Sequence, residues 1–133
     1  MRKIKQGAAL AFAATLALAG SFAFSTPAMA ASTPIGACGG GSYHVINKRD
    51  LGPAVIYLLY NGTTNCVVTW KDKPDNKWVS AVIRTYDINY RTDEGYFSTY
   101  AGPVKVNAAG QCIKWGGDYG DSLGWTSPWM HCG

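Results

Sequence analysis

The chain has 133 residues, 47% of them hydrophobic and 15% charged, and a formal net charge of +4. This length favours a single domain. Arg2, Lys3 and Lys5 are three of the 12 basic residues, so residues 31–133 carry nine bases against 8 acids. Nucleic-acid binding needs clustered Lys and Arg, and this even balance argues against a nucleic-acid partner.

Residues 1–30 have the three-part layout of a secretory signal peptide. A basic start is followed by an apolar run of small residues and by Ala28 and Ala30 in an A-x-A arrangement. A membrane anchor is the alternative, but the polar, helix-breaking residues 25–27 argue against it. We therefore predict secretion, cleavage after Ala30, and one disulfide-linked β domain at residues 31–133. That domain has no apolar stretch long enough to span a membrane.

All four cysteines (Cys38, Cys66, Cys112 and Cys132) follow the predicted cleavage site. An even number in a small secreted chain predicts a two-disulfide framework. A zinc site is disfavoured because no C-x-x-C pair occurs, so we expect no metal and no other cofactor. Three connectivities are open. Pairing Cys38 with Cys66 and Cys112 with Cys132 is favoured because it fastens both ends of the domain.

The first half of the predicted domain consists of short β-type runs separated by turn residues, with no sustained helical periodicity. Strands are expected at residues 43–47, 55–60 and 66–70. Asn61 and Gly62 between the last two form a strong hairpin signal. Residues 71–77 are charged and contain a proline, so an exposed loop is expected there.

The second half continues the pattern. Residues 78–86 alternate, with Val79, Ala81 and Ile83 able to share one face, whereas residues 87–95 are polar and loop-like. Further strands are expected at residues 96–101, 104–107 and 111–115, before a tail rich in Gly and Trp. About seven short strands with two disulfides predict an all-β fold, either a small antiparallel β-sandwich or a barrel.

Candidate catalytic residues are few, and we predict none. Small secreted ribonucleases use a Glu, a His and an Arg, but no helix is expected before the sheet as in those enzymes. A glycosidase pair and a serine triad are equally unsupported. The residues considered were Glu94, His44, His131, Arg84, Arg91, Asp93, Asp118 and Asp121. The last two resemble part of a calcium loop, but a simple turn is the favoured interpretation.

All five Trp and all eight Tyr fall within residues 31–133. Such rings combine an apolar face with a polar group and suit half-exposed surfaces. Trp115, Trp125 and Trp129 lie among glycines and form a candidate binding surface for sugar rings or for another protein. The alternative is that these rings pack over an open end of the sandwich.

Seven short motifs together resemble one known family. They are G-A-C (36–38), Y-H-V-I-N (43–47), Y-L-L-Y-N (57–61), N-C-V-V-T (65–69), Y-F-S-T-Y-A-G-P-V (96–104), A-G-Q-C-I-K-W-G-G (109–117) and C-G (132–133). The chain is thereby similar to the spore-associated protein A family, small secreted proteins of sporulating filamentous actinomycetes. The resemblance spans most of residues 31–133, keeps the four cysteines in order and brings no catalytic residues with it.

The resemblance implies a secreted, non-enzymatic protein at the spore or aerial-hypha surface or in the cell wall, with a structural or adhesive role. Spore wall polysaccharide or other surface proteins are the expected partners. The alternative is a secreted inhibitor or a carbohydrate- or protein-binding module acting in the medium, which would present residues 71–77 or 87–94. A small secreted hydrolase is the least favoured interpretation.

Overall fold

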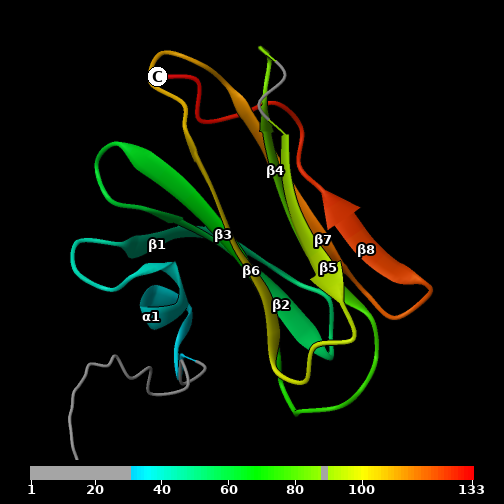
Figure 1. Cartoon of the computed structure of the whole chain (residues 1–133). Helices are drawn as coiled ribbons and strands as arrows, with labels where there is room; N and C mark the ends of the chain where they lie inside the picture. The colour runs from blue at the N-terminus through cyan, green and yellow to red at the C-terminus, as the bar shows by residue number, and fades with distance from the viewer. Residues whose placement is uncertain (1–30, 88–89) are drawn as a thin grey trace, which may run out of the picture. The chain divides into compact units, whose positions relative to one another are not determined.

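The computed structural model describes residues 31–87 and 90–133 (Figure 1). The predicted signal peptide at residues 1–30 lies outside the described residues. One short helix and eight strands follow in chain order: α1 (Pro34–Cys38), β1 (His44–Asp50), β2 (Ala54–Tyr60), β3 (Thr64–Lys71), β4 (Val79–Thr85), β5 (Tyr90–Gly95), β6 (Tyr100–Asn107), β7 (Ile113–Tyr119) and β8 (Leu123–Thr126).

The strands form two antiparallel sheets, ordered β1-β2-β3-β6 and β5-β4-β7-β8 (Figure 1). Hydrophobic side chains from both sheets share one buried core, with Ile56 and Val67 from the first sheet and Ile83 and Trp115 from the second. The alternation of β4 places Val79, Ala81 and Ile83 together in this core, as predicted. The all-β prediction is confirmed, and of the two predicted architectures the structure is the sandwich.

The helix α1 covers part of the outer face of the first sheet. Its first turn is capped by Thr33, whose side chain accepts a hydrogen bond from the Gly36 amide at 2.9 Å. Gly39 ends the helix with a φ of 117°. A helix of five residues is too short to show periodicity, so the sequence did not predict it. Among the described residues, no helix is long and apolar enough to cross a membrane.

Two strands lie where the sequence predicted loop or tail. β5 occupies most of the polar stretch at residues 87–95, and β8 lies in the Gly- and Trp-rich tail. Both are edge strands. An edge strand with solvent on one face needs few hydrophobic side chains, so the polarity of residues 87–95 was a misleading signal.

The strand β6 runs through Gly102 and Pro103, where the sequence predicted a break between two strands. Gly102 has a φ of 104°. A Cβ at this position would lie 2.6 Å from the Val67 carbonyl oxygen of β3. Only glycine tolerates both the positive φ and the close approach of the Val67 oxygen. The strand β6 therefore continues through this position, with a register shift, rather than ending there.

The predicted disulfide pairings are those in the structure: Cys38 is bonded to Cys66, and Cys112 to Cys132. The first ties α1 to β3. The second ties the tail to the segment before β7. Met130 of the tail also exchanges backbone hydrogen bonds of 2.8 and 3.0 Å with Ile113, the first residue of β7.

Removal of the Cys112–Cys132 bond by the double substitution C112A/C132A is expected to lower the free energy of unfolding by about 3 kcal/mol. The sequence separation is 20 residues, and the chain-entropy model gives this value for a loop of such length. Urea unfolding of the wild type and the variant measures the difference. A change below about 1 kcal/mol would show that Met130 and its hydrogen bonds hold the tail without the disulfide.

Candidate functional site

The three tryptophans predicted to form one binding surface occupy different places. Trp115 is fully buried, and its indole nitrogen donates to the Met130 sulfur at 3.3 Å. Its inward position on β7 therefore removes it from the candidate surface, which corrects the expectation for this residue. Trp125 is half-buried and meets Trp115 edge to face, with 4.9 Å between ring centroids. Trp129 is also half-buried, but it lies in a different environment.

Trp129 belongs to a basic–aromatic patch, which we define as Arg84, Tyr86, Lys114 and Trp129. The Tyr86 ring stacks on the Trp129 ring with a centroid distance of 4.0 Å, and Tyr86 is 63% exposed. The Arg84 guanidinium carbon lies 5.6 Å from the Trp129 ring centroid, and the Lys114 Nζ lies 5.2 Å from it. These distances allow cation–π attraction.

The two cations of the patch come from neighbouring strands. Arg84 of β4 and Lys114 of β7 are direct partners in the strand register. Like charges in this position repel each other, and the Trp129 ring offsets part of that repulsion. Within residues 31–87 and 90–133, neither cation forms an ion pair. The patch therefore combines positive charge with an exposed aromatic ring, which suits an anionic or sugar-containing surface.

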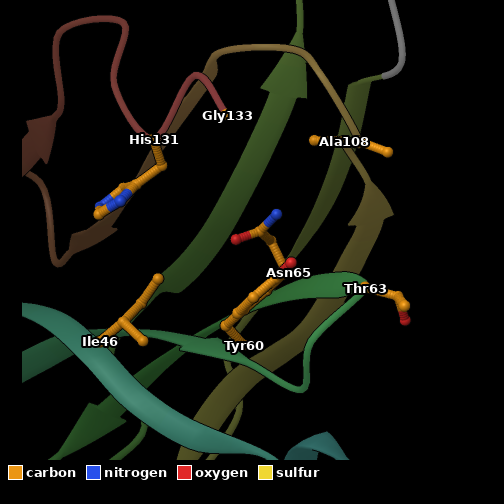
Figure 2. Close-up of a pocket in the computed structure, with 8 residues that line it drawn as sticks. Ile46, Tyr60, Thr63, Asn65, Ala108, His131 and Gly133 are labelled. Carbon is orange, nitrogen blue, oxygen red and sulfur yellow. The ribbon is translucent and has the colours of Figure 1, made fainter.

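A pocket lies at one end of the sandwich, beside the same tail. It has about 560 Å³ of empty space, part of it open to solvent. Figure 2 shows side chains converging on it from β1, β2, β3, the segment after β6 and the tail. The residues that matter for its chemistry are Ile46, Tyr60, Thr63, Asn65, Ala108 and His131.

The tail positions parts of both features. Trp129 contributes to the patch, the next residue Met130 packs against the core, and His131 lines the pocket. Cys132 then fixes the tail to Cys112. Sequence reasoning selected Trp129 but missed Tyr86, because nothing in the sequence links two rings that are 43 residues apart.

The opposite end of the sandwich is closed by an ion pair between a buried lysine, Lys71, and a half-buried aspartate, Asp75. Lys71 was predicted to lie in an exposed loop, but only 2% of it is exposed. Its Nζ donates to Asp75 Oδ1 at 2.5 Å and to the carbonyl oxygens of Lys77 and Phe97 at 2.8 and 2.6 Å. Tyr119 donates its hydroxyl hydrogen to the other oxygen of Asp75. The prediction was wrong for Lys71 because its ammonium finds partners within the protein.

This end cluster is held in one protonation state. The hydrogen bonds from Lys71, Tyr119 and the Lys77 amide lower the pKa of Asp75 from 3.8 to about 2. The same carboxylate raises the pKa of the Tyr119 hydroxyl above its usual value of 10.0. All three Lys71 hydrogens and both Asp75 oxygens have partners. The cluster therefore fixes the loop after β3 and offers no free acid or base for catalysis.

The structure does not assemble the residues considered for a ribonuclease-like site. Glu94 lies opposite Ser80 on β4, whereas Arg84 lies four residues further along that strand, about 13 Å away. Arg91 is three residues from Glu94 on β5, so the two side chains point to opposite faces. His44 lies in the other sheet, where its ring meets Tyr60 edge to face.

The acidic residues give no metal site either. Asp118 is part of β7, and its side chain accepts a hydrogen bond from the Ser80 hydroxyl at 3.1 Å. Asp121 follows in the turn before β8. Across the described part of the chain, no group of three or more His, Cys, Asp or Glu side chains could hold a metal ion.

Fold and surface together define a small β-sandwich with two disulfides and a tail that carries two candidate contact features. No protein-family model matches the chain, and the search of solved structures found no significant match. The chain is 38% identical over 96 residues to spore-associated protein A of Streptomyces coelicolor. This similarity confirms the predicted relationship to the spore-associated protein A family. The match covers 68% of this chain and 62% of that protein.

Proposed function

We propose that this chain is a secreted, non-enzymatic protein of the spore or aerial-hypha surface, with a structural or adhesive role. The basic–aromatic patch is the observation that carries the proposal. Arg84 and Lys114 supply positive charge with no ion-pair partner among the described residues, and Trp129 and Tyr86 supply ring surface. Wall polysaccharide with anionic groups, or an acidic surface protein, matches both properties.

Secretion is supported by two features of the chain. Residues 1–30 have the layout of a signal peptide, and both cysteine pairs are bonded in the structure. Structural disulfides form and persist in oxidising compartments outside the cytosol. Two cross-links also suit a small domain at an exposed surface, because they limit the entropy of the unfolded chain.

A secreted inhibitor acting in the medium is the second candidate, and the loop after β3 favours it. Lys71 and Asp75 hold this loop from inside, while the residues between them are exposed. A loop already ordered in this way loses little entropy when a partner binds it. The inhibitor candidate requires that substitutions in this loop, rather than in the patch, abolish binding.

The substitution W129A is expected to reduce retention on washed spores by about tenfold, which corresponds to about 1.4 kcal/mol. It removes the ring on which Tyr86 stacks and over which Arg84 and Lys114 lie. The loss of unfolding free energy should stay near 1–2 kcal/mol, because the ring is only half-buried. Immunoblots of the spore and wash fractions, with thermal melts of the same samples, measure both effects.

Salt provides a second measurement on this patch. Attraction through Arg84, which is exposed, and Lys114, which is half-buried, weakens as ionic strength rises. The wild type should therefore elute from spores with increasing salt, and K114Q should elute at a lower salt concentration. K105Q is the matched control, because Lys105 is an exposed lysine on the other sheet. Equal retention of W129A and the wild type would contradict the proposal.

A further inference from the structure

The floor of the end pocket contains a polar side chain that has no hydrogen-bond partner in the protein. Asn65 is only 6% exposed, and its side-chain amide forms no hydrogen bond with any residue that the structure describes. Figure 2 shows this amide pointing from β3 into the pocket, between His131 and Ala108. The atoms of this amide remain accessible to solvent in the pocket, so a ligand that enters can hydrogen-bond to them in place of water. The position therefore suggests a group that arrives from outside.

The rest of the pocket defines the chemistry of such a group. The Asn65 amide offers both hydrogen-bond donors and an acceptor, so it is complementary to another amide. Ile46 and Ala108 present apolar surface beside it, and Thr63 and His131 carry polar groups. No Lys, Arg, Asp or Glu side chain lines the pocket. The cavity volume of about 190 Å³ lies below the range of about 300–1,000 Å³ typical of drug-sized ligands, so the pocket suits no more than one small unit.

We infer that this end pocket binds an N-acetylhexosamine unit of a polysaccharide. The acetamido group of such a sugar has an N–H and a C=O for Asn65 and a methyl group for Ile46 and Ala108. Its ring hydroxyls can bond to His131. A blocked peptide unit also carries an amide and a methyl group, and the choice of a sugar over a peptide rests on the proposed function at the wall.

The test is an NMR titration of the disulfide-bonded protein with N-acetylglucosamine. A single sugar of this size should bind with a Kd on the order of 1 mM. The Asn65 side-chain NH₂ resonances should shift as the sugar is added. Glucose, which lacks the acetamido group, should bind about tenfold more weakly. An N-acetylated, C-terminally blocked alanine should also bind about tenfold more weakly than N-acetylglucosamine.

Two variants make the assignment specific. Asn65→Leu removes the amide at similar size, so it should lower the affinity for the sugar by about tenfold or more. Its melting temperature should not fall, because the amide it replaces has no partner in the free protein. Thr69→Val is the matched control. Thr69 lies on the same face of β3 and has a buried hydroxyl without a partner, but it does not line the pocket. Its sugar affinity should be unchanged.

Three outcomes would overturn the inference: no shift of the Asn65 resonances, equal binding of the blocked alanine, or full sugar affinity in Asn65→Leu. If Asn65→Leu fails to fold, the shift of the Asn65 resonances in the wild type still tests whether the sugar contacts this side chain. Spore fractionation tests the proposed function separately, because binding of a soluble sugar does not require the protein to be on spores.

Discussion

Replacement of Lys71 by methionine is expected to lower the free energy of unfolding by about 2–4 kcal/mol. Methionine fills much of the space of the lysine stem but supplies no donor. The Asp75 carboxylate and the carbonyl oxygens of Lys77 and Phe97 then lose the ammonium group that they share. Urea unfolding at neutral pH measures the loss. A loss below about 1 kcal/mol would mean that water replaces the ammonium group without difficulty.

The double variant K71M/D75N is the control for this prediction. Removing the carboxylate together with the ammonium leaves no unpaired charge, so the double variant should be less destabilised than the sum of the single variants. Additive effects would show that Lys71 and Asp75 act independently.

The acid dependence of stability gives an independent measurement on the same pair. The pKa of Asp75 is lowered to about 2 in the folded protein, from an ordinary value of 3.8. Because this pKa is lower in the folded protein, the ionised Asp75 carboxylate stabilises the fold above pH 3.8. This contribution disappears as the pH falls through about 2. The Lys71 hydrogen bond is the largest cause of the shift. K71M should therefore lose less stability than the wild type between these pH values.

The substitution W115A should destabilise the protein by about 3–5 kcal/mol, as is typical when a buried tryptophan is truncated. Trp115 is fully buried where the two sheets meet, and it also contacts Trp125 and Met130. The cavity would therefore affect both the core and the tail. Thermal and urea unfolding should show a much larger loss for W115A than for W129A.

The comparison of W115A with W129A separates packing from binding. If W129A melts as early as W115A, the Trp129 ring is a packing element and its role in adhesion is not supported. If W115A melts like the wild type, the core described around this residue is wrong. Trp115→Phe, which retains most of the ring volume, should recover more than half of the stability lost in W115A.

The sequence predicted those parts of the fold that depend on local patterns. Alternation in β4 placed Val79, Ala81 and Ile83 correctly, and the Asn61–Gly62 turn joined β2 to β3. The cysteine pairing followed from the order of the four residues. The edge strands β5 and β8 escaped prediction because their sequences are polar or rich in glycine, and α1 escaped because it has five residues.

The candidate site was less predictable because it depends on contacts between distant segments. The environment of Trp129 is created by Arg84 and Tyr86 from β4 and the segment that follows it. Lys71 looked like a loop residue because charge usually indicates exposure, yet Phe97 and Lys77 supply its acceptors. Asn65 looked like a turn residue next to a strand. Its importance emerges only when the tail closes the pocket above it.

Fractionation of a sporulating culture tests the central claim most directly. Washed spores, wall material and medium would be separated and probed with an antibody against residues 31–133. We expect the protein mainly on spores or in the wall, lacking residues 1–30 and released by high salt. Finding nearly all of it free in the medium would contradict the surface role and favour the inhibitor, and finding it inside cells with residues 1–30 attached would contradict secretion.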